Sequence, residues 1–378
     1  MLFAKAPIFF EEGSLSFASK IVKARPFRTA KPRLGRGSAV RTGRNETRFV
    51  LPELKFQFRL TSYSADKYLA KRFRIDYSQI PREPNIRLHC AQDLMKHSIA
   101  KVLNEAVDAL HKASINEPRM EAVSLLMHAL NVDRTFVLAH AERELTVDQL
   151  QKFRALVRRR ATHEPLQYII GFQEFFNLTF EVTPDVLIPR PETELIVEAA
   201  LDLLKQDPAP VITDIGTGSG CIIVSLLHEL KGARGVATDK SFAAINVARR
   251  NAERHSVAGR LELVQTDLGS ALSAVAHLSM IVSNPPYIPA GELQNLQPEV
   301  RDHEPMQALV SGDDGLSHIR DLLRATPLVL RDGGHFIFEI GFGQADRVRQ
   351  LIDDRVWKLV EIRSDLQNIP RTFVLQKR

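Results

Sequence analysis

The sequence contains little cysteine and no long apolar run. Its 378 residues include two cysteines, Cys90 and Cys221, too few for a disulfide scaffold or a cysteine-rich zinc site. No stretch of about 18 consecutive apolar residues occurs, which excludes a transmembrane helix. The histidines show no spacing typical of metal ligands, so we expect no metal site. A composition of 44% apolar and 25% charged residues is ordinary for a globular protein.

The charge is distributed unevenly along the chain. The formal net charge is +6, but residues 1–94 hold 19 Lys and Arg against 8 Asp and Glu, a net charge of +11. The remaining 284 residues hold 32 against 37, a net charge of −5. A mildly acidic body argues weakly against a large nucleic-acid interface, so we expect neither a direct nucleic-acid partner nor a membrane partner.

Residues 1–94 leave three interpretations open. Arginine, proline and glycine interrupt every periodicity, which is typical of a disordered extension with short ordered pieces around residues 56–69. The basic charge and the serines also fit an organelle transit peptide, although Glu11 and Glu12 come early. We slightly favour the third interpretation, that translation starts at Met95, because helical periodicity begins just after it. The expected location is the cytoplasm, or the mitochondrial matrix if the segment is a transit peptide.

A small helical bundle of about four helices is expected over residues 95–165, as a substrate-recognition domain. Apolar residues over 99–110 recur at the spacing of an amphipathic helix. Asn116 before Pro118 predicts the start of a second helix, which carries Met120 on its buried face.

Two further helices complete the bundle. One is expected over residues 134–140, and the capping box of Thr146 and Gln149 opens the other, with Val147 inside. The arginines at 158–160 suit the negative end of that helix, so we interpret them as a helix cap and not as a ligand site.

The pattern then changes from helices to strands. A β-hairpin (168–171 and 178–182) and a linker are expected over residues 166–195. From 196 to 378 strands and helices alternate, which predicts a doubly wound α/β sheet with an added antiparallel edge strand. Strands are expected at 211–214, 235–239, 261–265, 277–283, 335–340, 356–363 and 372–375, and helices at 221–230, 242–254 and 319–330.

A glycine-rich loop follows the first strand of this sheet, at residues 214–220. Its glycines let the backbone turn tightly and approach a ligand. A dinucleotide fingerprint would need glycine in place of Cys221, and no G-K-[ST] follows, so the loop resembles the nucleoside-binding loop of S-adenosylmethionine-dependent methyltransferases. Asp239 ends the next strand, where a carboxylate can accept both ribose hydroxyls. The expected cofactor residues are Asp214, Gly216, Thr217, Gly218, Ser219, Gly220, Asp239, Asp267, Leu268 and Asn284.

A Ser-Asn-Pro-Pro-Tyr sequence follows the apolar strand that ends at residue 283. A planar nitrogen such as that of a carboxamide is a poor nucleophile, because its lone pair is delocalised. The Asn284 side-chain oxygen and the Pro285 carbonyl can accept its two N–H groups. Pro286 stiffens the turn, and Tyr287 supplies an aromatic wall. This chemistry needs neither a general base nor a metal.

Residues from about 95 to 378 resemble the peptide chain release factor glutamine methyltransferase family, also called the HemK or PrmC family. The N-P-P-Y element is shared with DNA adenine methyltransferases and indicates only the type of target nitrogen. The Pro-Arg-Pro-Glu-Thr-Glu element and the Glu-Pro block at 304–305 narrow the target to glutamine. The matching segments are 188–194, 214–220, 283–288, 300–305, 308–309 and 312–316.

The resemblance implies a Rossmann-like class I methyltransferase fold with S-adenosylmethionine as cofactor. It implies methyl transfer to the glutamine amide of the Gly-Gly-Gln motif in release factors. Residues 216–220 and Asp239 would bind the cofactor, Leu268 would border the adenine, and residues 284–287 would hold the glutamine. Many members carry an aromatic residue at the place of Leu268, so stacking is expected to be weaker here.

Three other functions remain open from the sequence. A ribosomal-protein glutamine methyltransferase would use the same chemistry, and the sequence separates the two protein substrates poorly. A nucleic-acid adenine methyltransferase would want a basic face, which the net charge of −5 disfavours. A cofactor-sensing protein without activity is disfavoured because Asn284 and Asp239 are both present.

Overall fold

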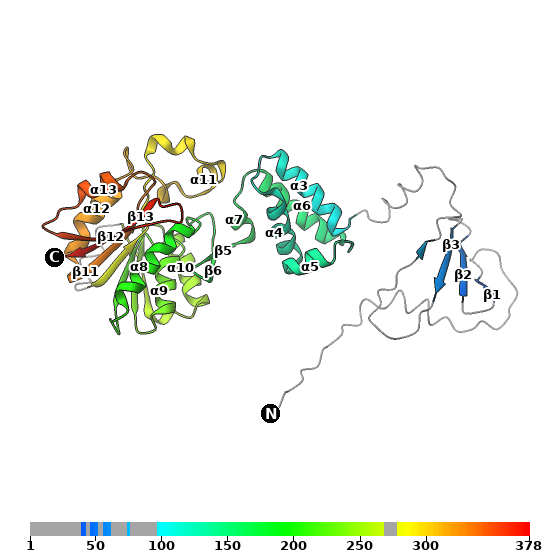
Figure 1. The fold of residues 1–378 in the computed structure, drawn as a ribbon, viewed down its shortest axis with the longest axis horizontal. Helices are drawn as coiled ribbons and strands as arrows, with labels where there is room; N and C mark the ends of the chain where they lie inside the picture. The colour runs from blue at the N-terminus through cyan, green and yellow to red at the C-terminus, as the bar shows by residue number, and fades with distance from the viewer. Residues whose placement is uncertain (1–38, 43–45, 52–55, 62–73, 76–96, 268–277) are drawn as a thin grey trace, which may run out of the picture. The chain divides into compact units, whose positions relative to one another are not determined.

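The computed structural model describes residues 39–42, 46–51, 56–61, 74–75, 97–267 and 278–378 (Figure 1). The chain divides into two compact units, residues 1–88 and 89–378, which are treated separately below. Among the described residues, no helix is both long enough and apolar enough to cross a membrane.

The first unit contains a small antiparallel sheet whose four strands follow one another in sequence order. Strand β3 (Phe56–Thr61) coincides with the start of the stretch in which short ordered pieces were expected. The other strands lie in the stretch for which a disordered extension was one of the three interpretations. The rest of residues 1–94 lies outside the described residues, and the interpretations of that segment stay predictions. The other three strands are β1 (Ala39–Thr42), β2 (Glu46–Leu51) and β4 (Arg74–Ile75).

The second unit begins with a helical bundle around its own apolar cluster, in which Phe153 is the largest buried side chain. The predicted capping box is confirmed, because Gln149 N donates to Thr146 Oγ1 and Thr146 N donates to Gln149 Oε1. The predicted helices are present with small shifts of their ends. They are α3 (Ile99–Lys112), α4 (Pro118–Leu130), α5 (Arg134–Ala139) and α6 (Val147–Ala161).

Three details of the predicted bundle are wrong. The residue that caps α4 is Glu117, in a left-handed conformation, and not Asn116. Met120 is 54% exposed and Val147 is 67% exposed, although both were placed inside. The buried face of α4 instead includes the small side chains of Ala122 and Ala129, which let neighbouring helices approach closely. Apolar spacing alone favoured the larger residues.

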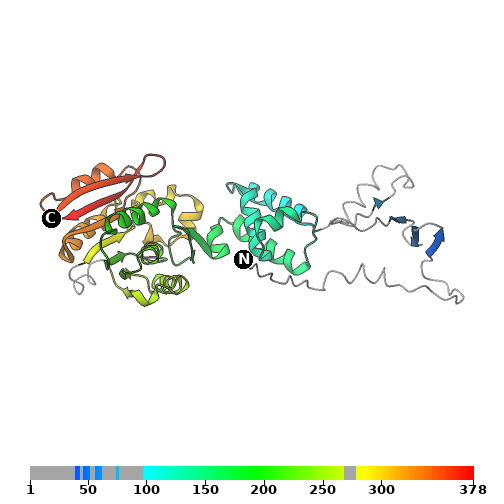
Figure 2. The same ribbon diagram turned by 60° about the horizontal axis from the view of Figure 1, so that its bottom comes forward.

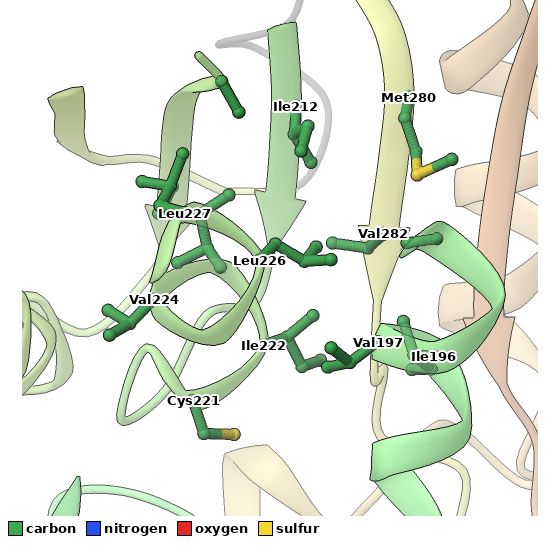
Figure 3. Packing of buried hydrophobic residues seen from close by; sticks show 14 of the residues in the cluster. Ile196, Val197, Ile212, Cys221, Ile222, Val224, Leu226, Leu227, Met280 and Val282 are labelled. Carbon is green, nitrogen blue, oxygen red and sulfur yellow. The ribbon is translucent and has the colours of Figure 1, made fainter. Parts of the chain in front are cut away.

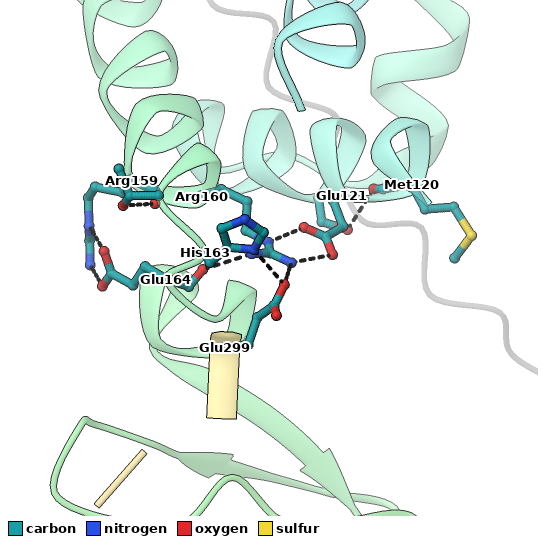
Figure 4. A network of polar contacts seen from close by, with 9 residues as sticks. Met120, Glu121, Arg159, Arg160, His163, Glu164 and Glu299 are labelled. Carbon is teal, nitrogen blue, oxygen red and sulfur yellow. Dashed lines mark hydrogen bonds and ion pairs between the residues drawn. The ribbon is translucent and has the colours of Figure 1, made fainter. Parts of the chain in front are cut away.

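Arg160 is a fourth correction in the bundle, because it does more than cap α6. It is buried and forms ion pairs with Glu121 of α4 and with Glu299 of α11 (Pro298–His303), the latter at 3.0 Å (Figure 4). His163 Nδ1 lies 3.3 Å from the same Glu299 carboxylate. A buried guanidinium needs such partners, since an unpaired charge there would be strongly destabilising. Arg160 therefore ties the bundle to a segment of the α/β domain.

The expected hairpin is present, but its first strand was placed too early. Residues 166–170 form a helix, α7 (Leu166–Ile170), which ends at Gly171 with φ +84°. The hairpin then consists of β5 (Phe172–Phe175) and β6 (Leu178–Glu181). The two residues between them have φ values of +48° and +58°, as a tight hairpin turn requires. β-branched residues before a glycine thus misled the assignment of residues 168–171.

The main sheet of the second unit consists of β7 (Val211–Ile215), β8 (Arg234–Asp239), β9 (Leu261–Gln265), β10 (Leu278–Ser283), β11 (Leu330–Glu339), β12 (Trp357–Ser364) and β13 (Pro370–Lys377). Their order is β12-β13-β11-β10-β7-β8-β9. Strands β7 to β11 pair in parallel, and β13 is antiparallel to both of its neighbours. The predicted doubly wound, Rossmann-like α/β fold is confirmed. The antiparallel strand lies one place inside the edge, however, and β12 is the edge strand.

Helices cover both faces of this sheet (Figures 1 and 2). Successive side chains of a strand point to opposite faces. Met280 and Val282 of β10 accordingly pack in the cluster that contains Ile222 (Figure 3), whereas Ile281 packs in the other cluster. The first cluster contains buried residues of α8 (Glu194–Leu204), α9 (Cys221–Glu229) and α10 (Phe242–Arg254). The second contains buried residues of α12 (Ser317–Ala325) and α13 (Ala345–Leu351).

We predict that Asn251→Ala lowers the free energy of unfolding by about 2–4 kcal/mol. Asn251 of α10 is buried, accepts from Glu181 N at 2.7 Å, and donates to Glu181 O at 3.0 Å and Ser219 O at 2.8 Å. Its removal leaves these buried backbone groups unpaired. Urea denaturation measures the change, with Asn246→Ala on the same helix as control, since Asn246 bonds only to exposed Arg249 among the described side chains. Equal effects of the two variants would contradict the prediction.

Candidate active site

The glycine loop between β7 and α9 has the open backbone that the sequence predicted. Gly216, Gly218 and Gly220 have φ values of +73°, +54° and +81°. A Cβ on Gly216 or Gly218 would meet no atom within 4 Å, so this side of the loop faces open space. A Cβ on Gly220 would instead lie 3.2 Å from the Ala248 Cβ of α10. Two glycines thus leave room for a ligand, and the third allows two helices to pack closely.

Asp239 lies beside this loop, at the carboxyl end of β8. Its Oδ2 accepts from Gly218 N at 2.9 Å, and its Oδ1 accepts from Ser241 N at 2.8 Å. Burial raises the pKa of Asp239, while the N–H groups of Ser241 and Gly218 oppose that rise. Each carboxylate oxygen can accept a further hydrogen bond. The arrangement therefore leaves acceptors for the hydroxyls of a ribose, and the cofactor-binding role of Asp239 stays a prediction.

Asp214 is fully buried at the start of the loop. Thr217 Oγ1 donates to its Oδ2 at 2.6 Å, and its Oδ1 has no hydrogen-bond partner among the described residues. Burial is the main cause that raises the pKa of Asp214 to about 7, and the charge of Asp239 adds to it. Asp214 thus shapes the loop through its hydrogen bond with Thr217.

The remaining predicted cofactor residues differ in their exposure to solvent. Thr217 and Ser219 are buried within the loop. Asp267 is exposed and forms an ion pair with Lys240 at 2.9 Å. Leu268 lies outside the described residues, so its predicted place beside the adenine stays a prediction.

The Asn-Pro-Pro-Tyr turn follows β10 directly and borders a small cavity of about 80 Å³. Pro285 is buried, and Asn284, Pro286 and Tyr287 are half-buried. Burial raises the pKa of the Tyr287 hydroxyl, and the carboxylate of Glu339 raises it further. The cavity is lined by Leu187, Arg190, Asn284, Tyr287, Ile288, Val300, Ala308 and Leu309.

Two residues that the sequence analysis missed hold the backbone of this turn. Gln344 Nε2 donates to Tyr287 O at 2.9 Å, and Gly341 N donates to Gln344 Oε1 at 2.9 Å. Gly315 has φ +76°, and a Cβ there would lie 2.4 Å from Tyr287 O. The Gly-Asp-Asp-Gly block that ends at Gly315 was the one available signal.

An ion pair joins two of the sequence blocks that marked the resemblance. Arg190 pairs with Glu304, whose Oε2 also accepts from Ile188 N at 3.3 Å. Burial raises the pKa of Glu304, and the charge of Arg190 and its hydrogen bond oppose that rise. The Glu-Pro block therefore holds the linker that precedes α8 against the cavity.

Asn284 is itself held by two buried residues that the sequence analysis did not select. Its Nδ2 donates to Thr193 Oγ1 at 3.0 Å, and Thr193 Oγ1 donates to Glu339 Oε2 at 2.6 Å.

In the part of the chain that the structure describes, no group of three or more His, Cys, Asp or Glu residues is arranged to hold a metal ion.

Comparisons with known proteins find two matching domain models and several relatives that share one name. The models of the PrmC N-terminal domain and of the methyltransferase small domain match residues 101–171 and 193–297. The chain is 41% identical over 279 residues to the release factor glutamine methyltransferase of Nitratidesulfovibrio vulgaris, covering 73% of this chain and 94% of that protein. It is 45% identical over 251 residues to the protein of the same name from Geobacter sulfurreducens, covering 66% of this chain and 87% of that protein.

We predict that Asp239→Ala weakens cofactor binding about 10- to 100-fold, because it removes a carboxylate that accepts charge-assisted hydrogen bonds. Titration calorimetry with S-adenosylmethionine measures the dissociation constant. Asp108→Ala, at an exposed position of α3, is the matched control and leaves binding unchanged. Unchanged binding by the Asp239 variant would refute the assigned role.

A second prediction concerns Gly315. Gly315→Ala lowers kcat about 10-fold or more, because the added methyl group pushes the Tyr287 carbonyl and displaces the turn by a fraction of an ångström or more. Gly333→Ala is the control, since Gly333 has the same φ of +76° and its Cβ would have no neighbour closer than 4.0 Å. Steady-state kinetics should show a low kcat for Gly315→Ala and a near-normal kcat for Gly333→Ala. Equal losses in the two variants would mean that backbone strain alone is responsible, and a near-normal kcat for Gly315→Ala would contradict the prediction.

Proposed function

Because this chain belongs to the release factor glutamine methyltransferase family, we propose that it methylates the glutamine of the Gly-Gly-Gln motif in peptide chain release factors. The acceptor atom is the side-chain amide nitrogen, and S-adenosylmethionine is the methyl donor. The observation that carries this proposal is the position of Asn284. Its side chain borders a small cavity and, through Nδ2, is anchored to Thr193, which leaves its oxygen available to a substrate.

The residues at the turn match the electronic problem of the reaction. An amide nitrogen shares its lone pair with the neighbouring carbonyl and attacks poorly. The Asn284 oxygen and the Pro285 carbonyl accept its two N–H groups, which hold the nitrogen in one place. Both acceptors are preorganised, so they stabilise positive charge on the nitrogen without reorientation.

The donor fits the glycine loop and Asp239 described above. When bound, S-adenosylmethionine supplies an electrophilic methyl group on a positively charged sulfur. As the bond from the nitrogen to the methyl carbon forms, the sulfur–methyl bond would break and leave neutral S-adenosylhomocysteine. One N–H proton would then pass to water, which returns the amide to neutrality. Tyr287 and Pro286 confine the planar amide, so that the nitrogen approaches along one direction.

We predict that Asn284→Ala lowers kcat about 100-fold or more, because it removes one of the two acceptors that stabilise the developing charge. The dissociation constant of S-adenosylmethionine stays within about threefold, since Asn284 is only one of the expected cofactor residues and the glycine loop and Asp239 are unchanged. Asn295→Ala, at an exposed position, is the control with the same chemical change. Near-normal turnover of the Asn284 variant would contradict the role of its carboxamide.

The proposed substrate is tested by transfer of labelled methyl to purified release factor. We expect label on the intact factor and none on a factor whose Gly-Gly-Gln glutamine is replaced by alanine. Ribosomal protein and DNA serve as competing acceptors in the same assay. Label that persists on the alanine variant, or that goes to another acceptor instead, would overturn the proposal.

A further inference from the structure

We propose that Thr193 and Glu339 are positioning residues that set the orientation of the Asn284 carboxamide. Through a chain of two hydrogen bonds they turn the amide so that its oxygen, and not its NH₂ group, is presented to the substrate. The inference rests on the proposed function, because it assigns a task to the same turn.

The three residues come from segments that are distant in sequence. Thr193 ends the short helix η2 (Pro191–Thr193), Asn284 follows β10, and Glu339 is the last residue of β11. Thr193 and Glu339 are each only 2% exposed. The donor–acceptor distances are 3.0 Å from Asn284 to Thr193 and 2.6 Å from Thr193 to Glu339. Both links thus have the length of normal hydrogen bonds, and the one between Thr193 and Glu339 is buried.

The direction of the chain follows from the number of protons available. A threonine hydroxyl carries one proton and two lone pairs. Because Thr193 gives its proton to the Glu339 carboxylate, its oxygen can only accept from Asn284. The Asn284 group that faces Thr193 must therefore be the NH₂ group. The reversed amide would place two acceptor oxygens against each other in a buried site, which is unfavourable.

The charge of Glu339 is what keeps this direction. Burial raises its pKa to about 7, and the nearby Glu192 raises it as well. The hydrogen bond from Thr193, the charge of Arg371 and the Tyr287 side chain lower it. Above that pH the carboxylate accepts from Thr193. Below it the protonated acid becomes a donor, Thr193 can donate to the Asn284 oxygen, and the amide turns the wrong way. Turnover should therefore fall as the pH drops through about 7.

The first test compares three conservative variants in methyl transfer to release factor. Thr193→Val keeps the shape but removes the hydroxyl, and we expect kcat to fall about 20-fold, as for the loss of a hydrogen bond that orients an acceptor. Thr193→Ser restores the hydroxyl and most of the turnover. Thr213→Val is the matched control, because Thr213 is also buried and its hydroxyl has no partner among the described residues. The dissociation constant of S-adenosylmethionine, measured for each variant, shows that the fold is intact.

The second test asks whether Thr193 acts through Asn284. If it does, Thr193→Val combined with Asn284→Ala is no slower than Asn284→Ala alone. If the kcat of the double variant instead falls by the product of the two single losses, Thr193 has only a structural role. Glu339→Gln keeps an acceptor oxygen for Thr193 but does not titrate, so its kcat should lose the part of the rise near pH 7 that Glu339 causes. Asp214, whose pKa is also raised to about 7 by burial, contributes equally to the profiles of both proteins.

The outcomes separate this inference from the proposed function. An unaltered protein that fails to methylate release factor overturns the function. An active unaltered protein whose Thr193→Val variant keeps kcat within about threefold, or whose Glu339→Gln variant keeps the same inflection, overturns the positioning role alone. If Thr193→Val binds no cofactor, the kcat of Thr193→Ser and the pH profile of Glu339→Gln still test whether Thr193 and Glu339 position Asn284.

Discussion

The register of the parallel strands is the constraint on which the site depends. Ser283 of β10 pairs with Ile215 on one side and with Phe338 on the other. The residues that come next, Asn284 after β10 and Glu339 at the end of β11, therefore lie at the same level of the sheet. A slip of one residue would move every side chain of β10 to the opposite face and separate these groups. The glycine loop and Asp239 leave the same edge, because β7 pairs with β8 in the same way.

The site places several polar groups in apolar surroundings, and two of them are held by partners from distant segments. Glu304 is paired with Arg190, and Glu339 accepts from Thr193. Groups of this kind contribute little net stability, since burial opposes their charge. What they provide is a fixed direction for donors and acceptors. The burial of the two apolar clusters that flank the sheet stabilises the fold and offsets the free-energy cost of burying these polar groups.

The parts of the site that could be predicted are those encoded in short segments. The glycine loop and the Asn-Pro-Pro-Tyr turn each follow a recognisable strand, and the alternation of strands and helices indicated the sheet. Thr193 lies 146 residues from Glu339, and Gln344 lies 57 residues from Tyr287, so no local sequence pattern predicts either contact. The burial of Arg160 was missed for the same reason. The helix α7 was missed because its β-branched residues favour strands, and the bundle packing overrides that preference.

The central claim is that two fixed oxygen acceptors hold the target amide beside the methyl donor. A crystal structure of the protein with S-adenosylhomocysteine and an unmethylated release factor tests it most directly. The account predicts that the glutamine amide nitrogen lies about 3 Å from both the Asn284 side-chain oxygen and the Pro285 carbonyl oxygen. A glutamine side chain that lies elsewhere, or an Asn284 that turns its NH₂ group toward the substrate, would contradict it.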